Sequence, residues 1–98
     1  MPKIEIDTCF KINKAKVSYR LINQEAVVLH LERGFYYSLN KTGTLIWQFI
    51  EQQRSLGEII EYLGSKLEIG AEELKNDAIS LLCDLEKEEL ILKMNYAH

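Results

Sequence analysis

Residues 24–47 read QEAVVLHLERGFYYSLNKTGTLIW and carry the most informative pattern in the chain. An apolar run at residues 26–31 is followed by the pair Arg33-Gly34 and by an aromatic-rich run at residues 35–39. Two such runs around a short glycine-containing connection predict a β-hairpin. Asn40 then stands where the N-cap of a helix is expected. If the strand at 35–39 lies at a sheet edge, its unpaired backbone groups offer a template for another extended segment.

The length and composition set limits on the function. Ninety-eight residues with 47 % apolar composition suit one domain, residues 1–98, with little room for a buried catalytic cavity. No run approaches the length of about eighteen apolar residues that a membrane span needs, and residues 1–11 carry charges where a signal peptide needs its apolar segment. We therefore expect a cytoplasmic protein with no membrane partner. Cys9 and Cys83 lack CxxC spacing and partner histidines, which predicts free thiols rather than a zinc site or a disulfide.

Further strands flank the hairpin in the predicted order of elements. Residues 1–15 contain short apolar alternations that predict either an N-terminal arm or an extra strand. The alternation at residues 17–21 predicts the first strand of a sheet, with a turn at Asn23-Gln24. Residues 90–94 predict a short closing strand, and residues 95–98 a tail.

Three helices are expected between the hairpin and the closing strand, at about 41–53, from Ser55 onward, and at about 71–89. Ser55 and Glu58 have the spacing of a capping box at the start of the second helix. In the first helix, Trp47 falls beside the main apolar stripe and is expected to cover the sheet. The predicted fold class is α+β, a winged helix-turn-helix with an N-terminal three-stranded antiparallel sheet followed by three helices.

The third helix has a wide apolar surface. Its apolar residues cover about half of the circumference, more than burial on one side requires. Either the helix is central and contacts the core on two flanks, or part of this surface lines an open groove beside the strand at 35–39. The two interpretations are compatible. The main stripe consists of Leu74, Ala78, Leu81 and Leu85, and is extended by Ile79, Leu82 and Cys83.

Charge is distributed unevenly. Residues 55–89 contain three lysines against ten carboxylates, a net charge of −7, whereas residues 1–54 carry a net charge of +3. The third helix of a winged-helix protein often enters the major groove of DNA. The expected third helix has seven acidic residues against Lys75 and Lys87, and such a surface repels phosphates. We therefore expect no nucleic-acid partner.

Catalytic chemistry finds little support in the sequence. Only His30 and His98 are candidates for a base at neutral pH; His30 lies in a strand pattern typical of a half-buried position, and His98 is the last residue. No glycine-rich phosphate loop and no nucleophile with an evident base is present. We expect no catalytic residues, no metal and no cofactor.

Several segments resemble PqqD-like proteins in their order and spacing. Residues 26–31, residues 34–43 and the pair Ile46-Trp47 are similar to the opening of that family, with its glycine-containing turn and tyrosine-rich strand ending in Leu-Asn. Residues 55–60 resemble the start of the family's second helix, and residues 77–92 resemble its third helix and closing strand. The resemblance extends over about residues 16–92. Residues 35–37 and Thr42-Gly43 look closer to the stand-alone domains of lasso-peptide and related pathways than to the pyrroloquinoline-quinone chaperone.

The resemblance implies a RiPP recognition element, a non-catalytic peptide chaperone that binds the leader segment of a ribosomally synthesised precursor by strand addition. Its partners would be the precursor leader peptide and a modifying enzyme or leader peptidase of the same pathway. A winged-helix regulator and an accessory subunit of a larger enzyme complex are the alternatives.

The expected peptide site lies between the strand at 35–39 and the third helix. Alternation of side chains predicts that Phe35, Tyr37 and Leu39 point inward and that Tyr36 is exposed. Ordinary core burial is the alternative for the apolar helix residues, and a solvated surface is the alternative for Asp77 and Asp84, which otherwise pair with leader lysines or arginines. The expected peptide-binding residues are Phe35, Tyr36, Tyr37, Ser38, Leu39, Leu74, Asp77, Ala78, Leu81, Asp84 and Leu85.

Overall fold

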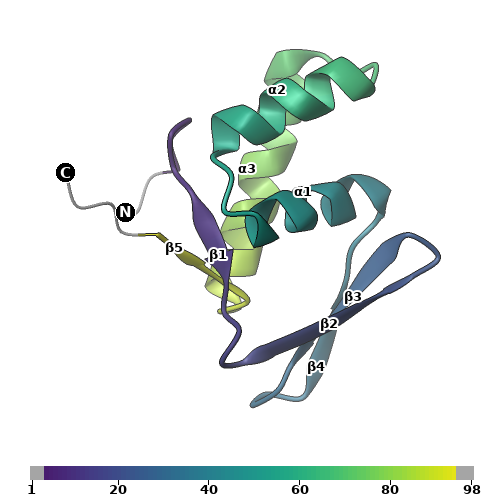
Figure 1. Cartoon of the computed structure of the whole chain (residues 1–98), viewed down its shortest axis with the longest axis vertical. Coiled ribbons are helices and arrows are strands. Elements are labelled where there is room, and N and C mark those ends of the chain that lie inside the picture. Colours follow the sequence, from purple (N-terminus) through teal and green to yellow (C-terminus); the bar gives the residue numbers. More distant parts are fainter. Residues whose placement is uncertain (1–3, 95–98) are drawn as a thin grey trace.

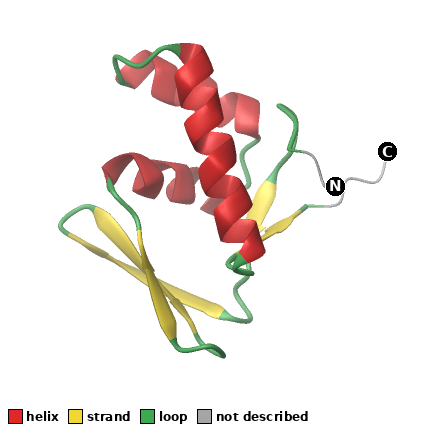
Figure 2. Ribbon diagram, turned by 180° about the vertical axis from the view of Figure 1, so that it is seen from behind, coloured by secondary structure: helices red, strands yellow, loops and turns green. Residues whose placement is uncertain are grey.

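The computed structural model describes residues 4–94, which form a mixed α+β arrangement of two antiparallel sheets and three helices. The helices lie on one side of the larger sheet, and the smaller sheet lies apart from it (Figures 1 and 2). The elements are, in chain order, β1 (Phe10–Ile12), β2 (Val17–Ile22), β3 (Glu25–His30), β4 (Phe35–Ser38), α1 (Lys41–Glu51), α2 (Leu56–Lys66), α3 (Ala71–Lys87) and β5 (Ile91–Lys93).

The larger sheet has the strand order β2-β3-β4, and both pairs are antiparallel. Its first hairpin turns at Asn23 and Gln24, whose φ angles of 53° and 68° are typical of the two-residue turns that match strand twist. The second hairpin turns through Gly34, which has a φ of 68° and carries no Cβ to oppose it. Both turns and all three strands confirm the predictions from the sequence.

The smaller sheet joins the two ends of the chain. β1 pairs with β5, so that Phe10 faces Lys93 and Ile12 faces Ile91. The N-terminal region therefore supplies an extra strand at 10–12, and its partner is the closing strand rather than the central sheet. The segment before β1 is held at the start of α2, where the amide of Leu56 donates to the carbonyl of Thr8 at 2.9 Å. Residues 1–3 and the predicted tail, including His98, lie outside the described residues.

Side-chain caps fix the starts of α1 and α2, whereas α3 begins after Gly70 without one. The side chain of Asn40 accepts from the amide of Gly43 at 2.8 Å at the start of α1. At the start of α2, Ser55 accepts from the amide of Glu58, and the Glu58 carboxylate accepts from the amide of Ser55, which confirms the capping box. Of the three helices described, none combines the length and the hydropathy that a membrane crossing needs.

The core corrects two details of the predicted helix faces. Trp47 belongs to the buried face of α1 itself. It covers the sheet as predicted, since it is fully buried and its ring contacts Tyr19 of β2 edge to face, with ring centroids 5.4 Å apart. On α3 the fully buried positions are Leu74, Ala78, Leu82 and Leu85, so the buried face is centred nearer Leu82 than Leu81. This rotation leaves Leu81 only partly buried at the side of the helix.

Candidate functional site

One edge of β4 is free of any strand partner within residues 4–94, since β4 pairs only with β3. The amide of Leu39 donates to the carbonyl of Ala26 at 2.9 Å, which fixes the phase of the β3–β4 ladder. Alternate residues of an antiparallel strand direct their backbone groups to opposite sides. The backbone groups of Tyr37 therefore face β3, and the N–H and C=O groups of Tyr36 and Ser38 face the open edge.

A groove of about 350 Å³ runs beside this open edge, between β4, the start of α1 and one side of α3. Its lining is apolar toward the core and polar toward the start of α1. The residues that line it are Tyr37, Ser38, Leu39, Asn40, Thr42, Gly43, Ile46, Ile69, Leu74, Asp77 and Leu81. An extended segment paired with β4 would place every second side chain over this groove.

The side chains of β4 alternate as the sequence predicted. Phe35 and Tyr37 are partly buried and Leu39 is buried, whereas Tyr36 is 69 % exposed and Ser38 is also exposed. Phe35 stacks on the ring of His30, with centroids 5.5 Å apart, and does not line the groove. Tyr37 and Leu39 thus form the strand wall of the groove, and the Tyr36 side chain lies on the opposite face of the sheet.

The helix wall contains only part of the predicted set. Leu74, Asp77 and Leu81 line the groove. Ala78 and Leu85 are fully buried and belong to the core, so the alternative given for them from the sequence holds. Asp84 is exposed and lies beyond the lining residues, one turn past Leu81.

Five lining residues were not among the predicted site residues: Asn40, Thr42, Gly43, Ile46 and Ile69. The first three lie at the start of α1, where the sequence had indicated a helix cap. Ile69 lies in the short connection between α2 and α3 and has no periodic pattern that would have marked it. Gly43 is close-packed, because an added Cβ would lie 3.2 Å from the side-chain oxygen of Asn40.

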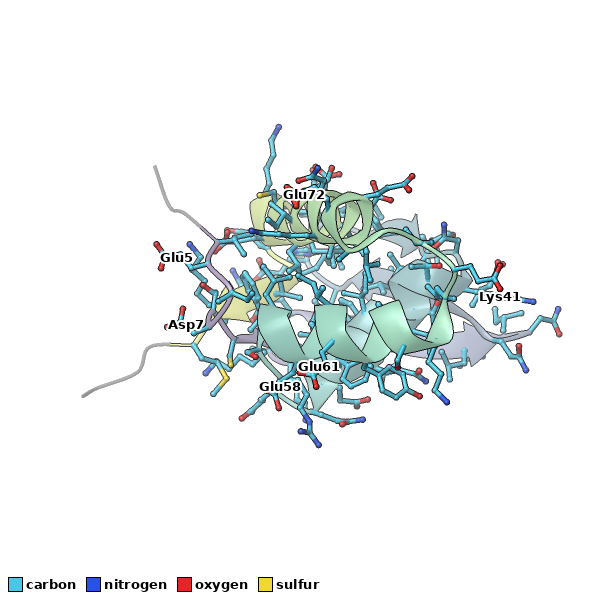
Figure 3. The ribbon with its side chains drawn as sticks, turned by 90° about the horizontal axis from the view of Figure 1, so that it is seen from above. Glu5, Asp7, Lys41, Glu58, Glu61 and Glu72 are labelled. Atoms are coloured by element: carbon cyan, nitrogen blue, oxygen red, sulfur yellow. The ribbon has the colours of Figure 1, made fainter. Side chains whose placement is uncertain are left out.

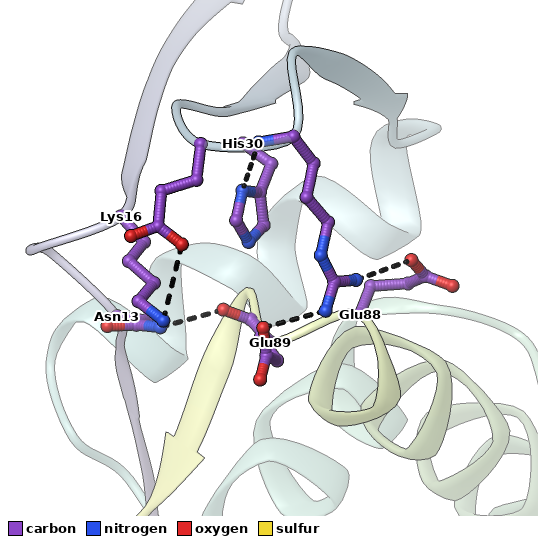
Figure 4. A network of polar contacts seen from close by, with 7 residues as sticks. Asn13, Lys16, His30, Glu88 and Glu89 are labelled. Carbon is purple, nitrogen blue, oxygen red and sulfur yellow. Dashed lines mark hydrogen bonds and ion pairs between the residues drawn. The ribbon is translucent and has the colours of Figure 1, made fainter.

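A polar network holds the β3–β4 turn against the end of α3 (Figure 4). The guanidinium of Arg33 donates to the Glu89 carboxylate at 2.8 Å and lies 3.7 Å from the Glu88 carboxylate. The backbone carbonyl of Glu89 accepts from the side-chain amide of Asn13 at 2.9 Å. The Arg33 contacts tie the β3–β4 turn to the C-terminal end of α3, and the Asn13 contact ties the connection between β1 and β2 to the same place.

The Tyr37 side chain of the strand wall lies near negative charges at the C-terminal end of α3. Burial raises the pKa of the Tyr37 hydroxyl, and the negative charges of Asp84 and Glu88 raise it further. Asp84 lies in the last turn of α3, and Glu88 is the C-cap residue of that helix. On the outside of the helices, Glu58 and Glu61 project from α2 and Glu72 from α3, away from the protein interior (Figure 3).

The family model described as "Coenzyme PQQ synthesis protein D (PqqD)" matches residues 25–91, which is more than half of the chain. The chain belongs to the PqqD family. The matched range begins at β3 and ends at β5, and so includes both walls of the groove. No curated protein matches the sequence.

Two solved structures are similar to this PqqD-family chain. One is TbiB1 in complex with the TbiA(beta) leader peptide, with 28 % sequence identity and a TM-score of 0.77 over 90 % of this chain and 99 % of that one. The other is lasso peptide synthetase B1 complexed with the leader peptide, with 24 % identity and a TM-score of 0.78 over 85 % of this chain and 96 % of that one. The second likeness shows the fold alone.

His30, Cys9 and Cys83 of this PqqD-family chain do not line the groove. His30 is fully buried rather than half-buried, and its Nδ1 accepts from the amide of Arg33 at 3.2 Å, within the β3–β4 turn. Cys9 and Cys83 are free thiols, as predicted. Among residues 4–94, no three His, Cys, Asp or Glu side chains are grouped so that they could hold a metal ion.

Proposed function

We propose that this chain binds the leader segment of a ribosomally synthesised precursor peptide as an added strand on β4, and presents the precursor to a modifying enzyme or leader peptidase. The observation that carries the proposal is the open β4 edge beside the groove. β1, which could have covered this edge, pairs with β5 instead. Membership of the PqqD family and the likeness to TbiB1, solved with a leader peptide, give independent support.

The binding has two parts in physical terms. The backbone groups of Tyr36 and Ser38 would exchange hydrogen bonds with the leader, which gives affinity without reading side chains. Apolar leader side chains on the inner face would enter the groove between Tyr37 and Leu81, and this burial would give sequence preference. Asp77 at the rim is placed to pair with a leader lysine or arginine.

The proposed role is non-catalytic. The residues that line the groove include no histidine and no cysteine, and Asp77 is the acidic one among them. The potential nucleophiles among them are hydroxyl groups, and these have no base to activate them. The helices and the closing strand follow the order of a winged helix, so we assign the fold to that class. We propose no role in DNA binding. The acidic residues that project from α2 and α3 oppose contact with phosphates (Figure 3).

The test is a titration of a fluorescent leader peptide of the precursor into the wild type and two Tyr36 variants. Tyr36→Pro removes an N–H that faces the open edge and leaves the β3–β4 ladder intact, so we expect affinity to fall by about a hundredfold. Tyr36→Ala keeps that N–H and serves as the matched control, with affinity expected within about fivefold of wild type. Equal binding by Tyr36→Pro and wild type would refute strand addition at this edge.

A further inference from the structure

The outer face of the β2-β3-β4 sheet has no covering element within residues 4–94. The helices lie on the other face, where Ala26, Val28 and His30 are fully buried (Figure 2). On the outer face, Val27 and Leu29 of the central strand remain only partly buried. Apolar side chains at the centre of an uncovered sheet are a common feature of protein interaction sites.

The strand register gathers these residues into one patch. Leu29 lies opposite Tyr36, which is 69 % exposed, and Val27 lies opposite Arg20. Ile22, at the end of β2, is 51 % exposed. We call these five residues, Arg20, Ile22, Val27, Leu29 and Tyr36, the outer-face patch; together with Ser18 and Tyr19 they line a shallow hollow of about 390 Å³.

The charge in the outer-face patch has no partner of its own among the described residues. Arg33 and Arg54 each form an ion pair with a glutamate, whereas no ion pair within residues 4–94 includes Arg20. An exposed arginine beside tyrosine and aliphatic side chains has the composition of an interface centre. It is suited to a partner that offers an apolar projection with a carboxylate next to it.

The outer-face patch is also continuous with the proposed leader site, because β4 contributes to both. A leader strand paired with β4 would widen the sheet by one strand, and alternate leader side chains would emerge on the outer face beside Tyr36 and Ser38. The loaded protein would then present a larger surface than the free protein. An enzyme that docks there would contact the leader and this chain together.

We infer that the outer-face patch is the docking surface for the enzyme that processes the precursor, and that the bound leader completes it. This inference rests on the proposed function. The partner surface is apolar with a carboxylate that pairs with Arg20. Docking is therefore coupled to leader binding: the enzyme binds the loaded protein more tightly than the free protein, and leader affinity rises by the same factor when the enzyme is present.

The test uses the purified enzyme that processes the precursor, immobilised for interferometry, with this protein added free or saturated with leader peptide. The double variant Arg20→Glu/Ile22→Ser changes two exposed β2 residues at the far side of the sheet from β4. We expect it to bind leader with an unchanged Kd, and its loaded form to bind the enzyme at least about tenfold more weakly than loaded wild type. Lys11→Glu, an exposed charge reversal on β1 in the smaller sheet, is the control and should bind the enzyme as wild type does.

Three results would overturn the inference, and they are distinguishable. Equal enzyme binding by the free and the loaded wild type would show that the leader does not complete the surface. Unchanged binding by the double variant would place docking elsewhere. A wild-type dimer in light scattering that Ile22→Ser dissociates would assign the face to a second copy of the chain. If the leader titration itself shows no binding by wild type, the proposed function fails first, and this inference with it.

Discussion

The outer strands of the two sheets differ in what lies beside them. In the smaller sheet the chain supplies both strands itself, since β1 from one end pairs with β5 from the other. In the larger sheet β4 has a partner on one side only, and its other side borders a groove. An exposed strand edge is a liability that proteins ordinarily cover or shorten. β1 thus joins the two ends of the chain, whereas β4 borders a groove, where we propose that another chain pairs with it.

The core contact of β1 offers the largest expected effect and a direct way to break this comparison. Phe10 is 2 % exposed, so Phe10→Ala should lower the free energy of unfolding by about 3–5 kcal/mol. Leader affinity of the folded protein should stay unchanged, because β1 has no part in the groove. Urea denaturation and leader titration measure the two quantities. If Phe10→Ala does not fold, Phe10→Leu is the milder variant to measure. Loss of leader affinity in fully folded Phe10→Leu would contradict the account in which β1 stabilises the fold and β4 binds the leader.

A change in the groove wall on α3 is expected to weaken leader binding, in contrast to the change in β1. Leu81 is partly buried and lines the groove, so Leu81→Ser should weaken leader binding by about tenfold through lost apolar contact. Ile79 is partly buried on the same helix but does not line the groove, which makes Ile79→Ser the matched control. Fluorescence anisotropy of a labelled leader measures both. A similar loss in the two variants would show that the effect is general destabilisation of α3.

The smallest expected effect is on stability and concerns Tyr19 of β2, the strand at the opposite edge of the larger sheet from β4. The Tyr19 hydroxyl donates to the Glu51 carboxylate at 2.5 Å, and burial together with this contact raises the pKa of Tyr19 from 10.0 to about 12. The stabilisation is present below pH 10 and is lost as the pH rises toward 12, because the unfolded chain releases this proton first. Tyr19→Phe should cost roughly 1 kcal/mol at pH 8.

The measurement for Tyr19 is urea denaturation at pH 8 and at intervals between pH 10 and 12. Wild type should lose stability over the alkaline interval more steeply than Tyr19→Phe, so that the two curves converge. Tyr37, whose pKa is also raised, is present in both proteins and cancels in the difference. Parallel curves would mean that Tyr19 does not titrate as its contacts indicate.

Much of the fold follows from local sequence signals. Local features that involve only a few residues could be predicted from the sequence. They include the turn at Gly34, the Asn23-Gln24 turn and the capping box at Ser55. The strand partner of β1 could not be predicted, because its pairing with β5 joins segments about eighty residues apart and no local sequence pattern encodes it. The sequence predicted that Trp47 covers the sheet but placed it outside the main buried stripe of α1, because the rotation of that helix against the sheet depends on packing.

The site was predictable in outline but not in its boundary. Alternation identified which side chains of β4 point inward, because the period of a strand is fixed. The apolar periodicity of α3 could not show that Ala78 faces the core and Leu81 faces the groove. Which of these neighbouring apolar positions faces the core depends on how the helices pack. Ile69 lies in a connection, where no periodicity exists.

The most direct test of the open edge is amide hydrogen exchange of β4, resolved by NMR, with and without leader peptide. Tyr36 and Ser38 amides should exchange fast in the free protein and slowly at saturating leader, whereas the Tyr37 amide, bonded to β3, should be slow in both states. Slow exchange of Tyr36 and Ser38 in the free chain, or fast exchange that saturating leader leaves unchanged, would contradict strand addition at β4.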